Sequence, residues 1–326
     1  MEVTYIQAIH DALAEEMRRD QSVFLLGEDI GVLGGAFLVT KGLHEEFGEK
    51  RVVDTPISES AIVGLAVGAA LAGMRPVAEM QFADFISCGF DQIVNMAATM
   101  RYRYGGDAGV PLVIRGPCGG GVHGGLFHSQ MPETWFYNVP GLKVVLPATA
   151  YDAKGLLKAA IRDDDPVLYF EHKYLYRRIK EDIPEDDFVV PIGEAIVRRE
   201  GEDLTIVTYS AMVHQALAAA ERLEKDDDIS VEVVDLRSVR PLDKQTVLES
   251  YKKTNKAIIL YESSKLGGVG AEIAAIIAEE AFEYMDGPLV RLACAESPAP
   301  FSPPLEKYYL PNVDDIVAAA KQLYAY

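Results

Sequence analysis

Hydrophobic residues of this chain fall into short apolar runs that alternate with stretches of helical periodicity. Runs of four to eight apolar residues bounded by polar or turn residues are typical of buried strands, whereas longer periodic stretches predict helices. In the first half we expect strands at Val23–Asp29, Pro76–Phe82, Val110–Pro117, Leu142–Ala148 and Pro166–His172, and helices at Glu59–Gly73, Phe90–Gly105 and Tyr151–Asp163. This alternation predicts a parallel sheet with helices on both faces.

The pattern breaks at residues 176–193, a charged stretch with two prolines that we interpret as a linker with little regular structure. Beyond it we expect strands at Asp203–Ser210, Ile229–Arg237 and Lys256–Ser263, and helices at Ala211–Asp226 and Gly270–Tyr284. The predicted fold class is therefore α/β with two doubly wound domains. We place the first at residues 1–180, the linker at 181–195 and a smaller second domain at 196–326.

Composition narrows the class of protein. The 326 residues are 49% hydrophobic and 25% charged, which is typical of a globular protein. The formal net charge of −19 argues against nucleic acid as a partner, because phosphates would be repelled. No run of 18 apolar residues is present, so no membrane span is expected. Three scattered cysteines fit a reducing compartment, and we expect a cytoplasmic protein.

The stretch GPCGGGVHGGLFHSQMPE, residues 116–133, combines a run of glycines with His123 and His128. A phosphate loop normally ends in Lys-Ser or Lys-Thr before a helix, and this one does not. A zinc site needs three or four ligands at suitable spacing, which two histidines do not provide. A third interpretation is a loop that carries an acid/base histidine, because the stretch follows a strand whose end faces the ligand crevice of an open α/β sheet. An exposed histidine without a role remains the alternative.

Two further features are candidates for chemistry. Glu59 stands at the head of a helix built from Ala, Gly, Val, Leu and Ile, where it either interacts with the helix N-terminus or is desolvated, with a raised pKa that suits a proton donor. Phe82 and Phe85 lie at and beyond the end of Pro76–Phe82. Aromatic residues there either pack in the core or present a flat surface for a ring.

Several motifs occur in an order that resembles a known family. They are LGEDIG from Leu26, DTPISE (54–59), RPVAEMQFADF (75–85), GGGVHGGLFHSQ (119–130) and VVDLRSVRPLD (233–243). The chain resembles, over nearly its whole length, the β subunit of thiamine-diphosphate-dependent 2-oxoacid dehydrogenases. The branched-chain type is the most similar, and the pyruvate and acetoin types are alternatives. A non-catalytic α/β binding subunit is the alternative from another class.

The resemblance implies roles for individual residues. Glu59 matches the acid that meets the ring nitrogen of the cofactor's aminopyrimidine, and Phe85 matches the aromatic residue that packs against that ring. Glu28 matches an acidic residue near the pocket. His128 matches the proton donor for acyl transfer to lipoamide, with His123 as its neighbour. The expected domains are a pyrimidine-binding thiamine-diphosphate fold and a C-terminal transketolase-type domain.

The resemblance also implies partners. Thiamine enzymes usually hold the diphosphate through magnesium with a Gly-Asp-Gly segment, which this sequence lacks. We therefore expect the diphosphate and magnesium to be held by an α subunit, in an α2β2 heterotetramer that is active only when complete. The lipoyl domain and the dihydrolipoyl acyltransferase core are the other expected partners.

A structural potassium ion is a further expectation from the resemblance. The matching residues are Leu112, Ala160, Ile161, Asp163 and Asp165. Carbonyl oxygens at the C-terminal end of a helix attract cations. An ordinary solvated acidic turn is the alternative interpretation of these residues.

Overall fold

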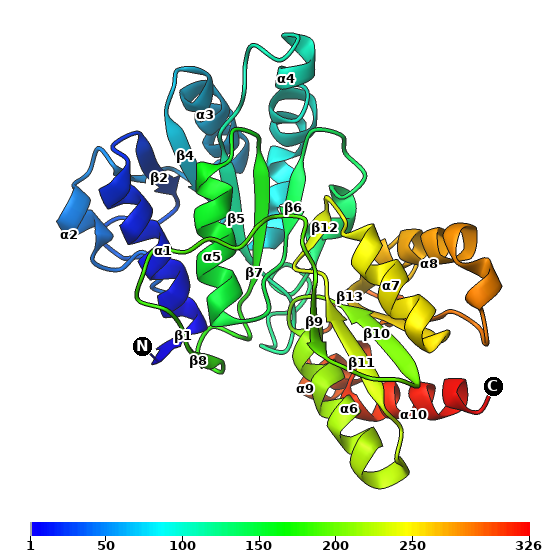
Figure 1. Ribbon diagram of the computed structural model, residues 1–326. Coiled ribbons are helices and arrows are strands. Elements are labelled where there is room, and N and C mark those ends of the chain that lie inside the picture. Colours follow the sequence, from blue (N-terminus) through cyan, green and yellow to red (C-terminus); the bar gives the residue numbers. More distant parts are fainter. Residues whose placement is uncertain (1) are drawn as a thin grey trace. The chain divides into compact units, whose positions relative to one another are not determined.

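The computed structural model describes residues 2–326, which divide into two compact units (Figure 1). Of the described residues, the first unit comprises 2–118 and Trp135–Ile192, and the second comprises Gly119–Thr134 and Gly193–Tyr326. The segment 119–134 thus groups with the C-terminal part of the chain although its neighbours in sequence belong to the first unit. The boundaries 180 and 196 stay a prediction.

The first unit is built on a parallel sheet with the strand order β6-β7-β5-β4-β2-β3. Its strands are β2 (Val23–Gly27), β3 (Val52–Asp54), β4 (Arg75–Glu79), β5 (Val113–Cys118), β6 (Lys143–Val145) and β7 (Val167–His172). The chain leaves β2 toward β3 on one side and returns to β4 on the other. This reversal is a topological switch point between the carboxyl ends of β2 and β4, and open α/β sheets commonly bind ligands in the crevice at such a point.

Helices cover both faces of this sheet. They are α1 (Tyr5–Arg19), α2 (Leu43–Phe47), α3 (Glu59–Leu71), α4 (Met100–Arg103) and α5 (Ala150–Arg162). Helices α1 and α5 pack against each other on one face, and α3 lies on the opposite face with residues 83–97 (Figure 1). Helix α1 begins with a capping box in which Thr4 and Gln7 satisfy each other's backbone N–H groups.

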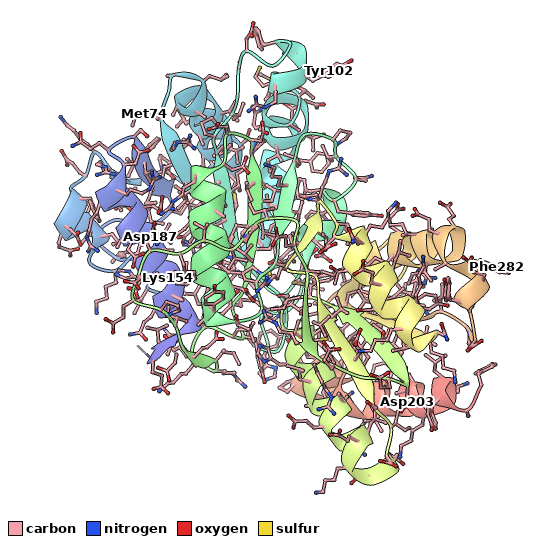
Figure 2. All side chains as sticks on the ribbon, in the orientation of Figure 1. Met74, Tyr102, Lys154, Asp187, Asp203 and Phe282 are labelled. Carbon is pink, nitrogen blue, oxygen red and sulfur yellow. The ribbon has the colours of Figure 1, made fainter. Side chains whose placement is uncertain are left out.

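The predicted regular helix over 90–105 is wrong in detail. Residues Gln92–Ala97 form wide π-helical turns, and the α-helix Met100–Arg103 follows them. The N–H of Ala98 donates a hydrogen bond to the carbonyl of Ile93, five residues earlier, and the Thr99 hydroxyl donates to the carbonyl of Asn95 at 2.7 Å. A side chain that occupies a backbone carbonyl in this way competes with the regular helical bond. Tyr102 projects from the end of this segment (Figure 2).

The linker is more ordered than predicted. Strand β8 (Lys180–Asp182) pairs antiparallel with β1 (Glu2–Thr4), while none of the described residues 183–195 belongs to a helix or strand. Asp187 forms ion pairs with Lys158 and Arg162 of α5, and Phe188 stacks on Tyr151 at 4.5 Å between ring centroids. Figure 2 shows Asp187 beside Lys154 where the linker crosses α5.

The second unit contains a five-stranded sheet with the order β14-β13-β10-β11-β9. Its strands are β9 (Ile196–Arg199), β10 (Leu204–Thr208), β11 (Val231–Asp235), β13 (Ala257–Ser264) and β14 (Val290–Cys294), and β12 (Ser238–Arg240) follows β11. All pairs are parallel except β11 with β9. Here the order of the strands reverses between β10 and β13.

The helices of the second unit include two packed pairs. The helices are α6 (Met212–Asp227), α7 (Lys244–Thr254), α8 (Val269–Glu280), α9 (Pro303–Tyr309) and α10 (Val313–Tyr324). Helix α6 packs on α10, and α7 packs on α8 (Figure 1). We did not expect α7, whose sequence is mostly polar and buries only Val247, Ser250, Tyr251 and Thr254.

The predicted fold class, α/β with two sheets of largely parallel strands, is confirmed. Strands that are buried on both faces consist of nearly continuous apolar residues, which made them visible in the sequence. Among the described residues, no helix is long and apolar enough to cross a membrane.

Candidate active site

Carboxylates gather at the crevice between β2 and β4 in the first unit. Glu28 follows β2 directly and Glu79 ends β4. Glu28 is only 5% exposed, and its Oε1 atom has no hydrogen-bond partner among the described residues. Burial, reinforced by the negative charges of Glu59, Asp29 and Glu79, raises the pKa of Glu28. The crevice thus offers a buried acceptor whose hydrogen-bonding capacity is unfilled.

Glu59 is brought to this crevice by α3. It is the first residue of the helix and is half-buried. The Ser58 side chain makes no capping bond there. Glu59 is the acidic residue of the first turn, where a negative charge is favoured by the helix dipole. Its negative charge contributes to the raised pKa of Glu28, so the two predicted carboxylates lie within electrostatic range of each other. The helix-end interpretation and the acid/base interpretation of Glu59 are compatible with this position.

The two phenylalanines beyond β4 have different environments. Phe82 packs edge-on against Phe37 with ring centroids 5.4 Å apart, and Phe37 in turn packs against Tyr176. Phe85 lies 6.5 Å from Phe82 and is half-buried. Phe82 therefore belongs to an aromatic cluster, whereas Phe85 stands at its margin in the short 3-10 segment Ala83–Gly89.

A buried ion-pair network that was not predicted from the sequence includes one of these carboxylates, Glu79. Arg115 of β5 is 1% exposed and forms ion pairs with Glu79 of β4 and Glu171 of β7. The Tyr176 hydroxyl donates to Glu171 at 2.7 Å. A detectable signal existed, because charged residues inside otherwise apolar strands such as VIRGP and LYFEH are rare unless they are paired.

His128 lies in the second unit, and the other three predicted residues, Glu28, Glu59 and Phe85, lie in the first. A backbone hydrogen bond from Gly119 to Gln130, at 2.9 Å, closes the segment that carries it. His128 is half-buried, while the His123 side chain is 51% exposed and contacts Glu306. A loop whose ends meet in this way is a compact unit and not a tether.

The alternative functions of this loop can now be compared with its geometry. The backbone N–H groups of Gly120, Gly121 and His123 donate to the carboxylates of Glu262 and Glu306. Groups that would bind a phosphate are thus occupied by the chain's own side chains. Within residues 2–326 no group of three or more His, Cys, Asp or Glu residues is arranged to hold a metal ion.

The residues expected to hold potassium lie around the end of α5. The carbonyl oxygens of Ile161 and Asp163 accept hydrogen bonds from Arg75 at 3.1 and 2.9 Å. Asp163 pairs with Lys143, and Asp165 pairs with Arg101. Cationic side chains thus contact this cluster, whose role as a potassium site stays a prediction.

Comparison with known proteins assigns both parts of the chain. Residues 1–178 match the transketolase pyrimidine-binding domain, and residues 193–316 match the transketolase C-terminal domain. The chain is 56% identical over 322 residues to the 2-oxoisovalerate dehydrogenase subunit beta of Bacillus subtilis (strain 168), with 98% of each chain covered. It is 48% identical over 321 residues, with the same coverage, to the pyruvate dehydrogenase E1 component subunit beta of Staphylococcus aureus (strain COL).

The chain belongs to the family of 2-oxoacid dehydrogenase β subunits. The predicted resemblance is therefore confirmed, as is the assignment to the oxidoreductases. This family depends on thiamine diphosphate and carries a transketolase-type fold. Membership favours an enzyme subunit over the alternative of a non-catalytic binding subunit.

Two solved structures support the fold of this β subunit. A split-gene transketolase, described as an inactive β4 tetramer, superimposes with a TM-score of 0.79 at 25% identity over 99% of this chain and 98% of its own. The transketolase of Leishmania mexicana superimposes with a TM-score of 0.70 at 15% identity, covering 99% of this chain and 46% of its own. The second likeness concerns the fold alone.

Proposed function

We propose that this chain is the β subunit of a branched-chain 2-oxoacid dehydrogenase and forms the pyrimidine end of its thiamine diphosphate site. The observation that carries the proposal is that Glu59, at the start of α3, lies within electrostatic range of the buried Glu28 at the switch point of the sheet, where Glu28 Oε1 has no partner among the described residues. The higher identity to the 2-oxoisovalerate enzyme, 56% against 48%, favours branched-chain substrates. Pyruvate and acetoin enzymes are the alternatives.

The residues of the crevice fit an aminopyrimidine. Such a ring carries N–H groups that a carboxylate accepts, and Glu28 Oε1 is a buried acceptor without a partner among the described residues. We assign Glu59 to hold and exchange a proton at the ring nitrogen, and Phe85 to pack against the ring face. When bound, thiamine diphosphate supplies the electron sink for decarboxylation.

His128 is assigned the proton transfer that accompanies passage of the acyl group to lipoamide. Its support is its place in a closed loop that folds with the second unit and the resemblance of the segment 119–130 to the family. This role implies that the lipoyl domain of a dihydrolipoyl acyltransferase core is a partner.

An α subunit completes the proposed enzyme as an α2β2 heterotetramer. The chain has no Gly-Asp-Gly segment for magnesium and diphosphate, so we assign that end of the cofactor to the α subunit. The structurally similar split-gene transketolase β4 tetramer is described as inactive, which agrees with a β chain that needs its partner. We propose a cytoplasmic location and a structural potassium ion bound at Leu112, Ala160, Ile161, Asp163 and Asp165.

The decisive experiment is co-expression with the α subunit and assay of decarboxylation with thiamine diphosphate and magnesium. We expect a higher kcat/KM for decarboxylation of 3-methyl-2-oxobutanoate than for decarboxylation of pyruvate. Glu59→Gln should lower decarboxylation by at least about 100-fold, because the amide cannot exchange a proton with the ring nitrogen.

Glu45→Gln is the matched control, because Glu45 is an exposed glutamate in the first turn of another helix, α2. Both variants should assemble with the α subunit and bind the cofactor, as judged by light scattering and calorimetry. A wild-type complex that decarboxylates neither 3-methyl-2-oxobutanoate nor pyruvate would contradict the function. Normal decarboxylation by Glu59→Gln would contradict only the role of Glu59.

A further inference from the structure

The histidine loop, residues 119–130, is held by buried carboxylates of the second unit that the family resemblance did not point to. Glu306 of α9 is 2% exposed and accepts hydrogen bonds from the backbone N–H groups of Gly121, at 2.9 Å, and His123, at 3.2 Å. Its second oxygen lies 2.6 Å from Nδ1 of His123. One buried side chain therefore fixes three groups of the loop.

A second carboxylate holds the preceding residue. Glu262 on β13 is 4% exposed and accepts a hydrogen bond from the N–H of Gly120 at 2.5 Å. Gly119, Gly121 and His123 all have positive φ angles, between 61° and 82°. A backbone in which positive and negative φ angles alternate turns successive N–H groups toward one side and creates a concave anion site. Here this site binds the chain's own carboxylates.

The far side of the loop is fixed to the same unit. Glu133 is fully buried and accepts a hydrogen bond from the Tyr209 hydroxyl, at the end of β10, at 2.8 Å. Tyr209 follows β10 and Glu262 lies in the C-terminal half of β13, and the strand order reverses between these two strands. The switch point of the second sheet, where α/β proteins commonly bind ligands, is thus used to hold this loop.

The anchored segments leave little freedom for His128. A Cβ atom on Gly124 would lie 2.7 Å from the carbonyl oxygen of His128, so the backbone at the two positions is in close contact. The N–H of His128 donates a hydrogen bond to the carbonyl of Gly125, and the side-chain amide of Gln130 donates to the carbonyl of Leu126. A displacement at 121–123 is therefore transmitted to His128 through a short, closely packed turn.

We propose that Glu306 is a positioning residue that holds the backbone of residues 121–123 and thereby places His128 for acyl transfer. Glu262 supports it at Gly120. The acyl-transfer part of this inference rests on the role proposed for His128, whereas the anchoring of the loop does not. This role depends on the length of the Glu306 side chain, because its carboxylate must extend from α9 to the N–H groups of Gly121 and His123.

Two conservative variants of Glu306 separate the effect of side-chain length from the effect of charge. Glu306→Asp keeps the charge but withdraws the carboxylate by one methylene, so it should lose the bonds to Gly121 and His123. Glu306→Gln loses the charge but retains an oxygen at the same reach, and its amide nitrogen suits a neutral His123. Lys307→Ala, on the exposed side of the same helix, is the control.

The first measurement is hydrogen–deuterium exchange of the full chain in complex with its α subunit. In Glu306→Asp we expect at least about tenfold faster exchange in peptides covering 119–131 and unchanged exchange in 204–208 of β10. Glu306→Gln and Lys307→Ala should resemble the wild type. Wild-type exchange of 119–131 in Glu306→Asp, or equally fast exchange in Glu306→Gln, would overturn the inference, whether or not the enzyme proves active.

The second measurement divides the reaction into two steps. Decarboxylation is followed with an artificial electron acceptor, and acylation is followed with an isolated lipoyl domain. A misplaced catalytic group can cost about 100-fold in rate, so we expect Glu306→Asp to reduce acylation by about 10- to 100-fold while decarboxylation changes less than twofold. Equal loss of both steps would show a general structural role and would contradict the positioning role.

Discussion

At the residue scale, Glu133 is a carboxyl group that the fold removes from water. It is fully buried, and one of its carboxylate oxygens accepts a hydrogen bond from the Tyr209 hydroxyl. Burial is the main cause that raises the pKa of Glu133 from 4.5 to about 7, and the charge of Glu262 adds to it. A carboxyl group next to the histidine loop is therefore partly protonated near neutral pH.

The raised pKa of Glu133 predicts a pH-dependent stability. Because the folded pKa exceeds the unfolded value, the native state retains a proton that the unfolded chain releases, and stability is lost as the pH rises from about 4.5 to 7. Glu133→Gln cannot ionise, so its free energy of unfolding should increase relative to wild type by up to ~3 kcal/mol between pH 4.5 and 8. Denaturant unfolding of both proteins at these two pH values measures the difference.

The control for Glu133 is Glu283→Gln, because Glu283 is exposed. Its free energy of unfolding relative to wild type should not change with pH. A constant difference between Glu133→Gln and wild type at pH 4.5 and 8 would show that Glu133 is not a buried acid of raised pKa.

At the element scale, the C-terminal end of α5 shows how helix ends are completed in this fold. Its last carbonyl groups have no partner within the helix and attract cations. Arg75, the first residue of β4, donates to the carbonyls of Ile161 and Asp163. Each of these oxygens keeps a second lone pair, which leaves room for the proposed potassium ion.

Potassium bound at this helix end should stabilise the protein. An ion that binds only the native state raises the midpoint of unfolding with its concentration. We expect the Tm to be a few degrees higher in KCl or RbCl than in NaCl or LiCl at equal ionic strength, because the larger ions fit a carbonyl cage. Identical Tm values in all four salts would remove potassium from the proposal.

At the scale of the whole molecule, the division of the chain into units does not follow the sequence. Residues 119–134 leave the first unit after β5, fold with the second unit, and return at Trp135. The second unit consequently carries His128, although it contributes neither Glu28 nor Glu59. It thereby holds a proposed catalytic residue in addition to its own packed core.

The shared cofactor predicts that this chain is inactive alone. With thiamine diphosphate, magnesium and 3-methyl-2-oxobutanoate, we expect no decarboxylation by the isolated chain above the background of heat-treated protein. Addition of the purified α subunit should restore activity and saturate at a one-to-one ratio. Decarboxylation by the isolated chain, confirmed on a preparation free of α subunit, would contradict the division of the cofactor site.

The sequence by itself determined the fold class, most of the strands and helices, and the family. Strands such as β5 and β7 are buried on both faces and helices such as α1 have an apolar stripe, so their patterns are local. The candidate residues Glu59, Phe85 and His128 were likewise found from short motifs in order.

Only the tertiary structure decided which distant side chains meet. Glu262 and Glu306 lie more than 130 positions from the loop they hold, and in sequence they look like ordinary glutamates of a strand and a helix. Hydrogen bonds across such separations have no local pattern, because they form only when the sheet and α9 have packed. For the same reason the sequence showed a glycine-rich loop with two histidines, while the fold revealed what keeps His128 in place.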